Sequence, residues 1–189
     1  TINSDTIAKY RGLHFRSPVY ELSGQLEFNF LEYQPGNPLY TWTPFIYAGI
    51  SLFHYNPQAE NNNGEWVGLQ ELGTEGQGTT TYPDRKKYSL IQFSIPMGGG
   101  VKIAINESFN IILEYGARKT FTDYLDDVST TYPGDKLMDM SPASIEMSDP
   151  SGQQMKNSQR GDPDKKDWYS FVGITLSFKL NNNTEGCDY

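Results

Sequence analysis

Residues 18–33 read Pro18-Val19-Tyr20-Glu21-Leu22-Ser23-Gly24-Gln25-Leu26-Glu27-Phe28-Asn29-Phe30-Leu31-Glu32-Tyr33, with apolar and polar side chains in alternation. One face carries Tyr20, Leu22, Gly24, Leu26, Phe28 and Phe30, and the other carries Glu21, Ser23, Gln25, Glu27 and Asn29. Successive side chains of a β-strand point to opposite faces, so this period of two predicts a strand. The alternation is longer than the usual strand of a soluble protein and fits a tilted strand that crosses a membrane.

Four further stretches repeat this pattern: 41–56, 88–105, 109–125 and 168–180. In the stretch 109–125, for example, Leu113 shares the apolar face and Asn110 belongs to the opposite one. The sequence therefore predicts an all-β, antiparallel fold with about five long strands.

The connections between these strands alternate in length. A short one surrounds residues 34–38, a long one covers 57–87, the tight turn 106–108 follows, and a second long one covers 126–167. Outer-membrane β-barrels have short periplasmic turns and long extracellular loops. We therefore expect a transmembrane β-barrel in a bacterial outer membrane, with the long loops outside the cell.

A sheet of five strands leaves two open edges, and lipid offers no hydrogen-bond partners to the backbone groups along them. We expect about three further strands before Thr1, which would complete a narrow barrel of about eight strands. On this interpretation residues 1–180 are the C-terminal part of the barrel, and residues 181–189 are a periplasmic tail.

Composition excludes several classes of function. The net charge of -8 and the pI near 4.7 argue against nucleic acid as a partner, because nucleic-acid sites are usually basic. No run of 18 apolar residues exists, so a transmembrane helix is not expected. Outer-membrane lipid is the partner that the strand pattern itself predicts.

The sequence offers little for catalysis. His14 precedes the first strand and His54 continues an outward register, so neither has an evident partner base. Asp123, Asp126 and Asp127 lack the spacing of a calcium loop, and we expect them on a solvated rim. We expect no enzyme activity, no metal and no cofactor.

Six charged residues take inward positions of the predicted strands: Glu21, Glu27, Lys102, Glu114, Arg118 and Lys179. Such residues could form a path for protons or ions. A narrow barrel also needs paired interior charges simply to fill its interior, and we favour this structural polar network.

Three segments resemble the PorG family of outer-membrane barrels in the type IX secretion system. They are Phe15 to Phe30, Thr122 to Tyr132, and Arg160 to Pro163 together with Asp167 to Phe171. The resemblance implies a non-catalytic subunit that anchors or positions a periplasmic ring formed by the lipoprotein PorK and by PorN. Other secretion subunits would be further partners.

Cys187 is the only cysteine, and the predicted topology places it in the periplasm. An unpaired cysteine in an oxidising compartment suggests an intermolecular disulfide or a reactive thiol. The resemblance makes the PorK-like lipoprotein the candidate for such a disulfide, and an incidental free cysteine is the alternative.

Two other functions stay open. An autonomous barrel could stabilise the envelope or adhere through its extracellular loops. A soluble, lipocalin-like barrel would need an apolar interior and a polar exterior, which is the reverse of the expected arrangement of Glu27 and Leu26.

Overall fold

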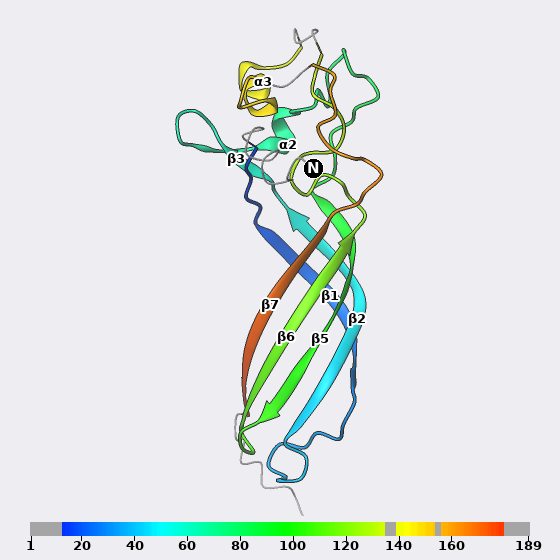
Figure 1. Cartoon of the computed structure of the whole chain (residues 1–189), viewed down its shortest axis with the longest axis vertical. Coiled ribbons are helices and arrows are strands. Elements are labelled where there is room, and N and C mark those ends of the chain that lie inside the picture. Colours follow the sequence, from blue (N-terminus) through cyan, green and yellow to red (C-terminus); the bar gives the residue numbers. More distant parts are fainter. Residues whose placement is uncertain (1–12, 135–138, 154–155, 180–189) are drawn as a thin grey trace, which may run out of the picture. The chain divides into compact units, whose positions relative to one another are not determined.

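Five long strands form one antiparallel sheet in the computed structural model, which describes residues 13–134, 139–153 and 156–179 (Figure 1). They are β1 (Val19–Asn29), β2 (Trp42–Tyr55), β5 (Ile91–Ala104), β6 (Phe109–Thr120) and β7 (Trp168–Phe178). Their order in the sheet, β1-β2-β5-β6-β7, places each long strand beside the next one along the chain. The prediction of an all-β, antiparallel fold is confirmed.

The register of β6 and β7 keeps the apolar side chains of both strands on one face. Phe109 pairs with Phe178 at one end, and Lys119 pairs with Trp168 at the other. Between these ends, Leu113 lies opposite Ile174. Such cross-strand pairs stabilise a sheet and fix its register, because a slip of one residue would move every side chain to the wrong face.

Two strands end earlier than the alternation predicts. β6 ends at Thr120, whose Oγ1 donates to the carbonyl oxygens of Asp167 at 2.7 Å and Thr122 at 3.1 Å. β1 ends at Asn29, and the Leu31 amide donates to Thr43 Oγ1 at 3.0 Å. In both places a threonine hydroxyl takes part in hydrogen bonds that compete with the regular strand ladder.

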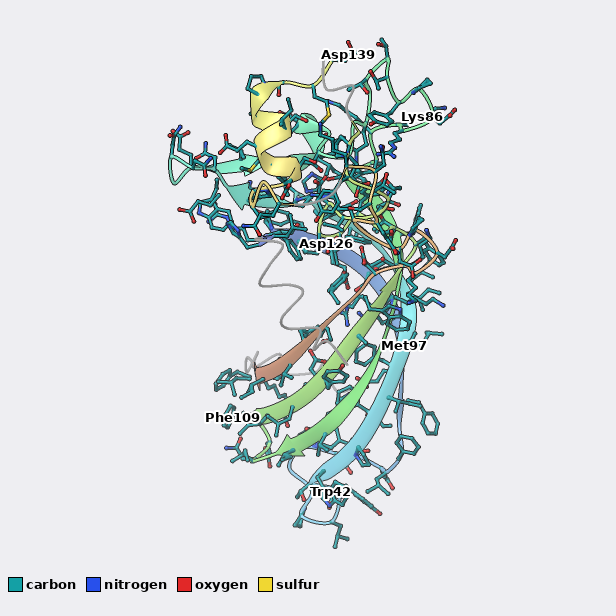
Figure 2. The ribbon with its side chains drawn as sticks, turned by 45° about the horizontal axis from the view of Figure 1, so that its top comes forward. Trp42, Lys86, Met97, Phe109, Asp126 and Asp139 are labelled. Carbon is teal, nitrogen blue, oxygen red and sulfur yellow. The ribbon has the colours of Figure 1, made fainter. Side chains whose placement is uncertain are left out.

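Two shorter connections, residues 30–41 and 105–108, join β1 to β2 and β5 to β6, and the second is a tight turn, as predicted. In the first, the Gln34 amide donates to the Tyr40 carbonyl at 3.0 Å, and Gly36 has a φ of 90°. In the second, Asn106 Oδ1 accepts from the amide of Phe109 at 2.9 Å. Trp42 and Phe109, the first residues of β2 and β6, mark the strand ends that follow these turns (Figure 2).

The chain divides into two compact units. The unit that we call the sheet unit contains the described residues 23–51, 95–119 and 168–179. The second, here the loop unit, contains the described residues 13–22, 52–94, 120–134, 139–153 and 156–167.

The loop unit carries the remaining secondary structure: β3 (Gln58–Glu60), β4 (Trp66–Gly68), α2 (Leu69–Leu72) and α3 (Pro142–Ser148). Ala59, Leu69 and Met147 form a small buried core between these elements, with Val67 and Leu72 packed against it. The sequence predicted these segments only as long connections, so this core is an additional finding.

Local capping defines both helices. The Ser141 side chain accepts from the Ser144 amide at 3.1 Å, and Pro142 begins α3, where a missing amide hydrogen costs nothing. α2 ends at Gly73, which has a φ of 65°. No helix in the described part of the chain is long and apolar enough to cross a membrane.

Candidate functional site

The outward face of the sheet unit is apolar and exposed. Leu26 on β1 is 86% exposed, and Val172 on β7 is 81% exposed. Further exposed hydrophobic side chains lie at alternating positions of the strands: Phe28, Ile46, Ile50, Leu113, Tyr115, Ile174, Leu176 and Phe178. Soluble monomers seldom expose a continuous apolar surface of this kind, so this face is suited to contact with another apolar medium.

The opposite face of the sheet unit is buried on β2 and on part of β6, where it mixes aromatic with polar groups. Phe45, Tyr47 and Ser51 are buried on β2, and Arg118 on β6 is only 6% exposed. The Arg118 guanidinium donates from Nη1 to the Tyr47 hydroxyl at 3.2 Å, and its central carbon lies 4.5 Å from the centre of the Phe171 ring. The charge of Arg118 is therefore held among hydrogen-bonding and aromatic partners.

Two glycines make room for the Tyr47 side chain. A Cβ at Gly98 would lie 2.6 Å from the Tyr47 hydroxyl oxygen. At Gly116, a Cβ would lie within 2.5 Å of both the Tyr47 hydroxyl and Arg118 Nη1. Both distances are too short for real contacts, so glycine at these positions allows the inner face to close around Tyr47.

The structure brings together part of the polar network predicted from the sequence. Lys102 and Glu27 form an ion pair in the sheet unit, with side chains that are 16% and 36% exposed. Glu114 is half-buried beside Gly173, and Lys179 is exposed one residue beyond β7. Glu21 is half-buried and belongs to the loop unit.

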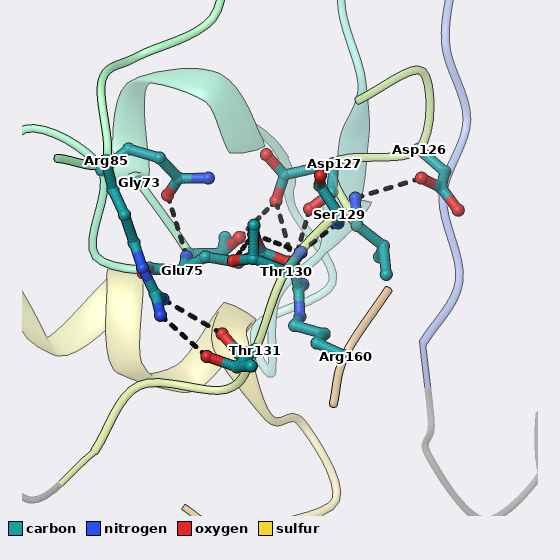
Figure 3. A network of polar contacts seen from close by, with 12 residues as sticks. Gly73, Glu75, Arg85, Asp126, Asp127, Ser129, Thr130, Thr131 and Arg160 are labelled. Atoms are coloured by element: carbon teal, nitrogen blue, oxygen red, sulfur yellow. Dashed lines mark hydrogen bonds and ion pairs between the residues drawn. The ribbon is translucent and has the colours of Figure 1, made fainter. Parts of the chain in front are cut away.

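The loop unit contains a second polar network, which sequence analysis did not identify. The fully buried Glu75 carboxylate accepts from the amides of Ser129 at 2.9 Å and Thr130 at 3.0 Å (Figure 3). Arg160 donates from Nη1 to Glu75 Oε1 at 3.2 Å and to the Asp127 carbonyl at 2.6 Å. Arg85 donates a hydrogen bond from Nη2 to Thr131 Oγ1 at 2.7 Å. One buried ion pair thus joins segments from both long connections.

Asp127 lies at the centre of this network. Its carboxylate accepts from the hydroxyl groups of Tyr88, at 2.6 Å, and Thr74, and Arg160 Nη1 lies 3.8 Å from Oδ2. Burial raises the pKa of Asp127 to about 6, although the neighbouring Arg160 opposes this shift. Burial also raises the pKa of Tyr88, and the charge of Asp127 adds to the effect.

The expectation of a solvated acidic rim is wrong. Asp123 and Asp127 are buried, and Asp126 is half-buried. Asp127 is buried beside the ion pair of Glu75 and Arg160, which lie 85 residues apart in the sequence. No spacing rule links residues so distant, and the alternating glycines around Glu75 are the only local signal of an unusual backbone there.

The remaining candidate residues have plain environments. His14 Nε2 accepts from the Glu60 amide at 3.3 Å, and His54 is exposed with its ring 6.3 Å from that of Tyr20. The part of the chain that the structure describes contains no group of three or more His, Cys, Asp or Glu side chains that could hold a metal ion. Cys187 lies outside the described residues.

Comparisons with known proteins give one family. A family model described as a domain of unknown function, DUF6089, matches residues 1–139, which include β1, β2, β5 and β6. No curated protein and no solved structure matches the chain. Because the matched residues make up more than half of the sequence, the protein belongs to the DUF6089 family.

Proposed function

We propose that this chain is part of an outer-membrane β-barrel that acts without catalysis as a subunit of the type IX secretion system. In this role the barrel anchors or positions a periplasmic ring of PorK and PorN.

One observation carries the membrane part of the proposal: the exposed, apolar outward face of the sheet unit. Leu26, Ile50, Leu113 and Val172 come from four different strands, and all are exposed on that face. Bilayer hydrocarbon would cover these side chains and remove them from water, which is favourable by about 25 cal/mol for each Å² of apolar surface. The opposite face, with Arg118 and Tyr47, supplies the buried polar interior that a narrow barrel needs.

Barrel closure requires further strands between β1 and β7, which occupy the two edges of the five-stranded sheet. An unpaired edge in lipid would leave backbone donors and acceptors without partners, at several kcal/mol for each group. About three further strands, as expected from the sequence, would give an even number and a closed barrel of about eight.

The secretion role is supported by the resemblance of three segments, around Leu22, Asp126 and Trp168, to the PorG family. Affinity purification of the whole protein from its own membranes in mild detergent tests this role. We expect PorK and PorN among the co-purified proteins, identified by mass spectrometry. An unrelated small outer-membrane barrel with the same tag is the control, and recovery of equal PorK and PorN with both baits would contradict the role.

The same experiment separates an alternative, a barrel that acts through its extracellular loops. The ordered loop unit, with its buried pair of Glu75 and Arg160, favours this alternative because unstructured loops would not need such a network. A membrane-inserted barrel that recovers no ring component and whose deletion leaves secretion intact would support the loop-based function.

We further propose that Cys187 forms the covalent link to the ring lipoprotein. Two thiols would lose two protons and two electrons to the oxidising system of the periplasm as the S–S bond forms. A band of the summed mass on non-reducing gels should disappear with reductant and with Cys187→Ser. An unchanged monomer in both strains, with normal secretion in the mutant, would contradict the link.

A further inference from the structure

A cavity of about 190 Å³ lies within the loop unit, beside its hydrophobic core. Apolar side chains form most of its lining, among them Phe15, Leu69, Val128 and Met147. The cavity is partly open to solvent, and its volume is comparable to that of an engineered apolar cavity of about 150 Å³ that binds benzene. The space therefore fits an aliphatic or aromatic group of about six non-hydrogen atoms.

Asp126 brings a carboxylate to this apolar lining. Its Oδ1 accepts from the Val128 amide at 3.0 Å, and the nearby charge of Arg160 offsets only part of the cost of burying the carboxylate. In Figure 3 the Asp126 side chain points away from the hydrogen bonds and ion pairs that join Glu75, Asp127 and Arg160. Burial and the nearby Asp167 raise the pKa of Asp126 to about 6, which shows how poorly this environment solvates the charge.

The charge around the cavity is negative. Arg160 also contributes to the lining, but its guanidinium already bonds the Glu75 carboxylate and lies near that of Asp127. Two carboxylates thus share one cation, and Asp126 adds a further negative charge. A ligand that carries a positive charge would stabilise Asp126, whereas an anion would be repelled.

We propose that this cavity binds an aliphatic chain that ends in an ammonium group, such as a lysine side chain. The methylene groups would pack against Leu69 and Met147, and the ammonium would donate to the carboxylate of Asp126. This proposed ligand is argued from the lining and the charge of the cavity alone. It does not depend on the proposed role in secretion.

Ligand-observed NMR with the whole protein in detergent at pH 7.5 tests the proposal. The probes are Nα-acetyl-lysine methylamide, n-pentylammonium, and Nα-acetyl-norleucine methylamide, which has an apolar side chain without the charge. We expect saturable binding of at least one ammonium probe, at least about ten-fold tighter than that of the norleucine probe. Binding of the lysine probe indicates a peptide ligand, and binding of pentylammonium alone indicates a free amine.

The key variant is Asp126→Asn, which keeps the shape of the side chain and removes its charge. It should weaken binding of the ammonium probe at least about ten-fold, whereas Asp164→Asn, at an exposed aspartate outside the cavity lining, should leave binding unchanged. Equal affinity for the lysine and norleucine probes in the unmodified protein would overturn the assignment without any variant. Absence of saturable binding for both ammonium probes would overturn it as well.

Discussion

Tyr47 shows how closely the inner face of the sheet unit is packed at the level of single residues. Gly116→Ala would place a methyl group 2.2 Å from the Tyr47 hydroxyl and 2.6 Å from the Phe171 ring. We expect a loss of stability of about 1–3 kcal/mol, the usual cost of overpacking, measured by urea unfolding of the whole protein in detergent. Gly24→Ala is the matched control, because nothing lies within 4 Å of the added methyl group. Equal unfolding midpoints for both variants would show that the inner face is loosely filled.

A second residue-scale prediction concerns pH and the buried carboxyl group of Asp127. Folding raises its pKa from the ordinary value of 3.8 to about 6, so between these values the folded protein binds more protons than the unfolded protein. The loop unit should therefore lose stability as the pH rises through this window, because the charged form is the one that burial disfavours. Hydrogen-exchange protection of residues 126–131, corrected for intrinsic exchange rates, measures this change between pH 4 and pH 6.5.

Asp127→Asn is the control for the pH prediction. The amide oxygen can keep the hydrogen bond from Tyr88, the amide nitrogen replaces the oxygen that accepts from Thr74, and the side chain does not titrate. The dependence on pH should become shallower in this variant. Protection that increases with pH in the unmodified protein would contradict the assigned direction.

The secondary-structure elements show what alternation can and cannot predict. The period of two located all five long strands and placed Leu26 and Leu113 on the exposed apolar face, because side-chain direction in a strand is a local property. The strand ends were less predictable, since Thr43 and Thr120 end the ladder through side-chain bonds. The network of Glu75 and Arg160 was not predictable, because its partners meet only after the long connections fold.

The outward face of β6 gives a prediction at the scale of one element. Leu113→Arg would place a charge in lipid and should cost about 2–4 kcal/mol near the midplane of the membrane. The control is Thr175→Arg on β7. Ile174 pairs with Leu113, so its neighbour Thr175 lies at nearly the same depth, but its side chain is on the opposite face. The measurement is the fraction of each variant that refolds into lipid vesicles as the urea concentration rises. Equal yields would contradict a lipid-facing Leu113.

At the scale of the whole molecule, the alternating connections predict the topology. A protease added to intact cells should cut within residues 57–87 or 126–167, but not within 106–108. Cutting within 106–108 should appear only after the cells are permeabilised, and a periplasmic protein serves as the marker for intact cells. Cleavage of 57–87 and 126–167 only in permeabilised cells would reverse the topology.

The central claim is that the apolar face of the sheet unit contacts lipid, and spin labels along β7 test it most directly. Single cysteines at positions 172–177, in a Cys187→Ser background, would carry the labels in protein reconstituted into vesicles. Oxygen concentrates in lipid, so labels at Val172, Ile174 and Leu176 should collide with oxygen more often than labels at Gly173, Thr175 and Ser177. Equal oxygen collision rates at all six positions, together with free access of a water-soluble nickel complex, would contradict the claim.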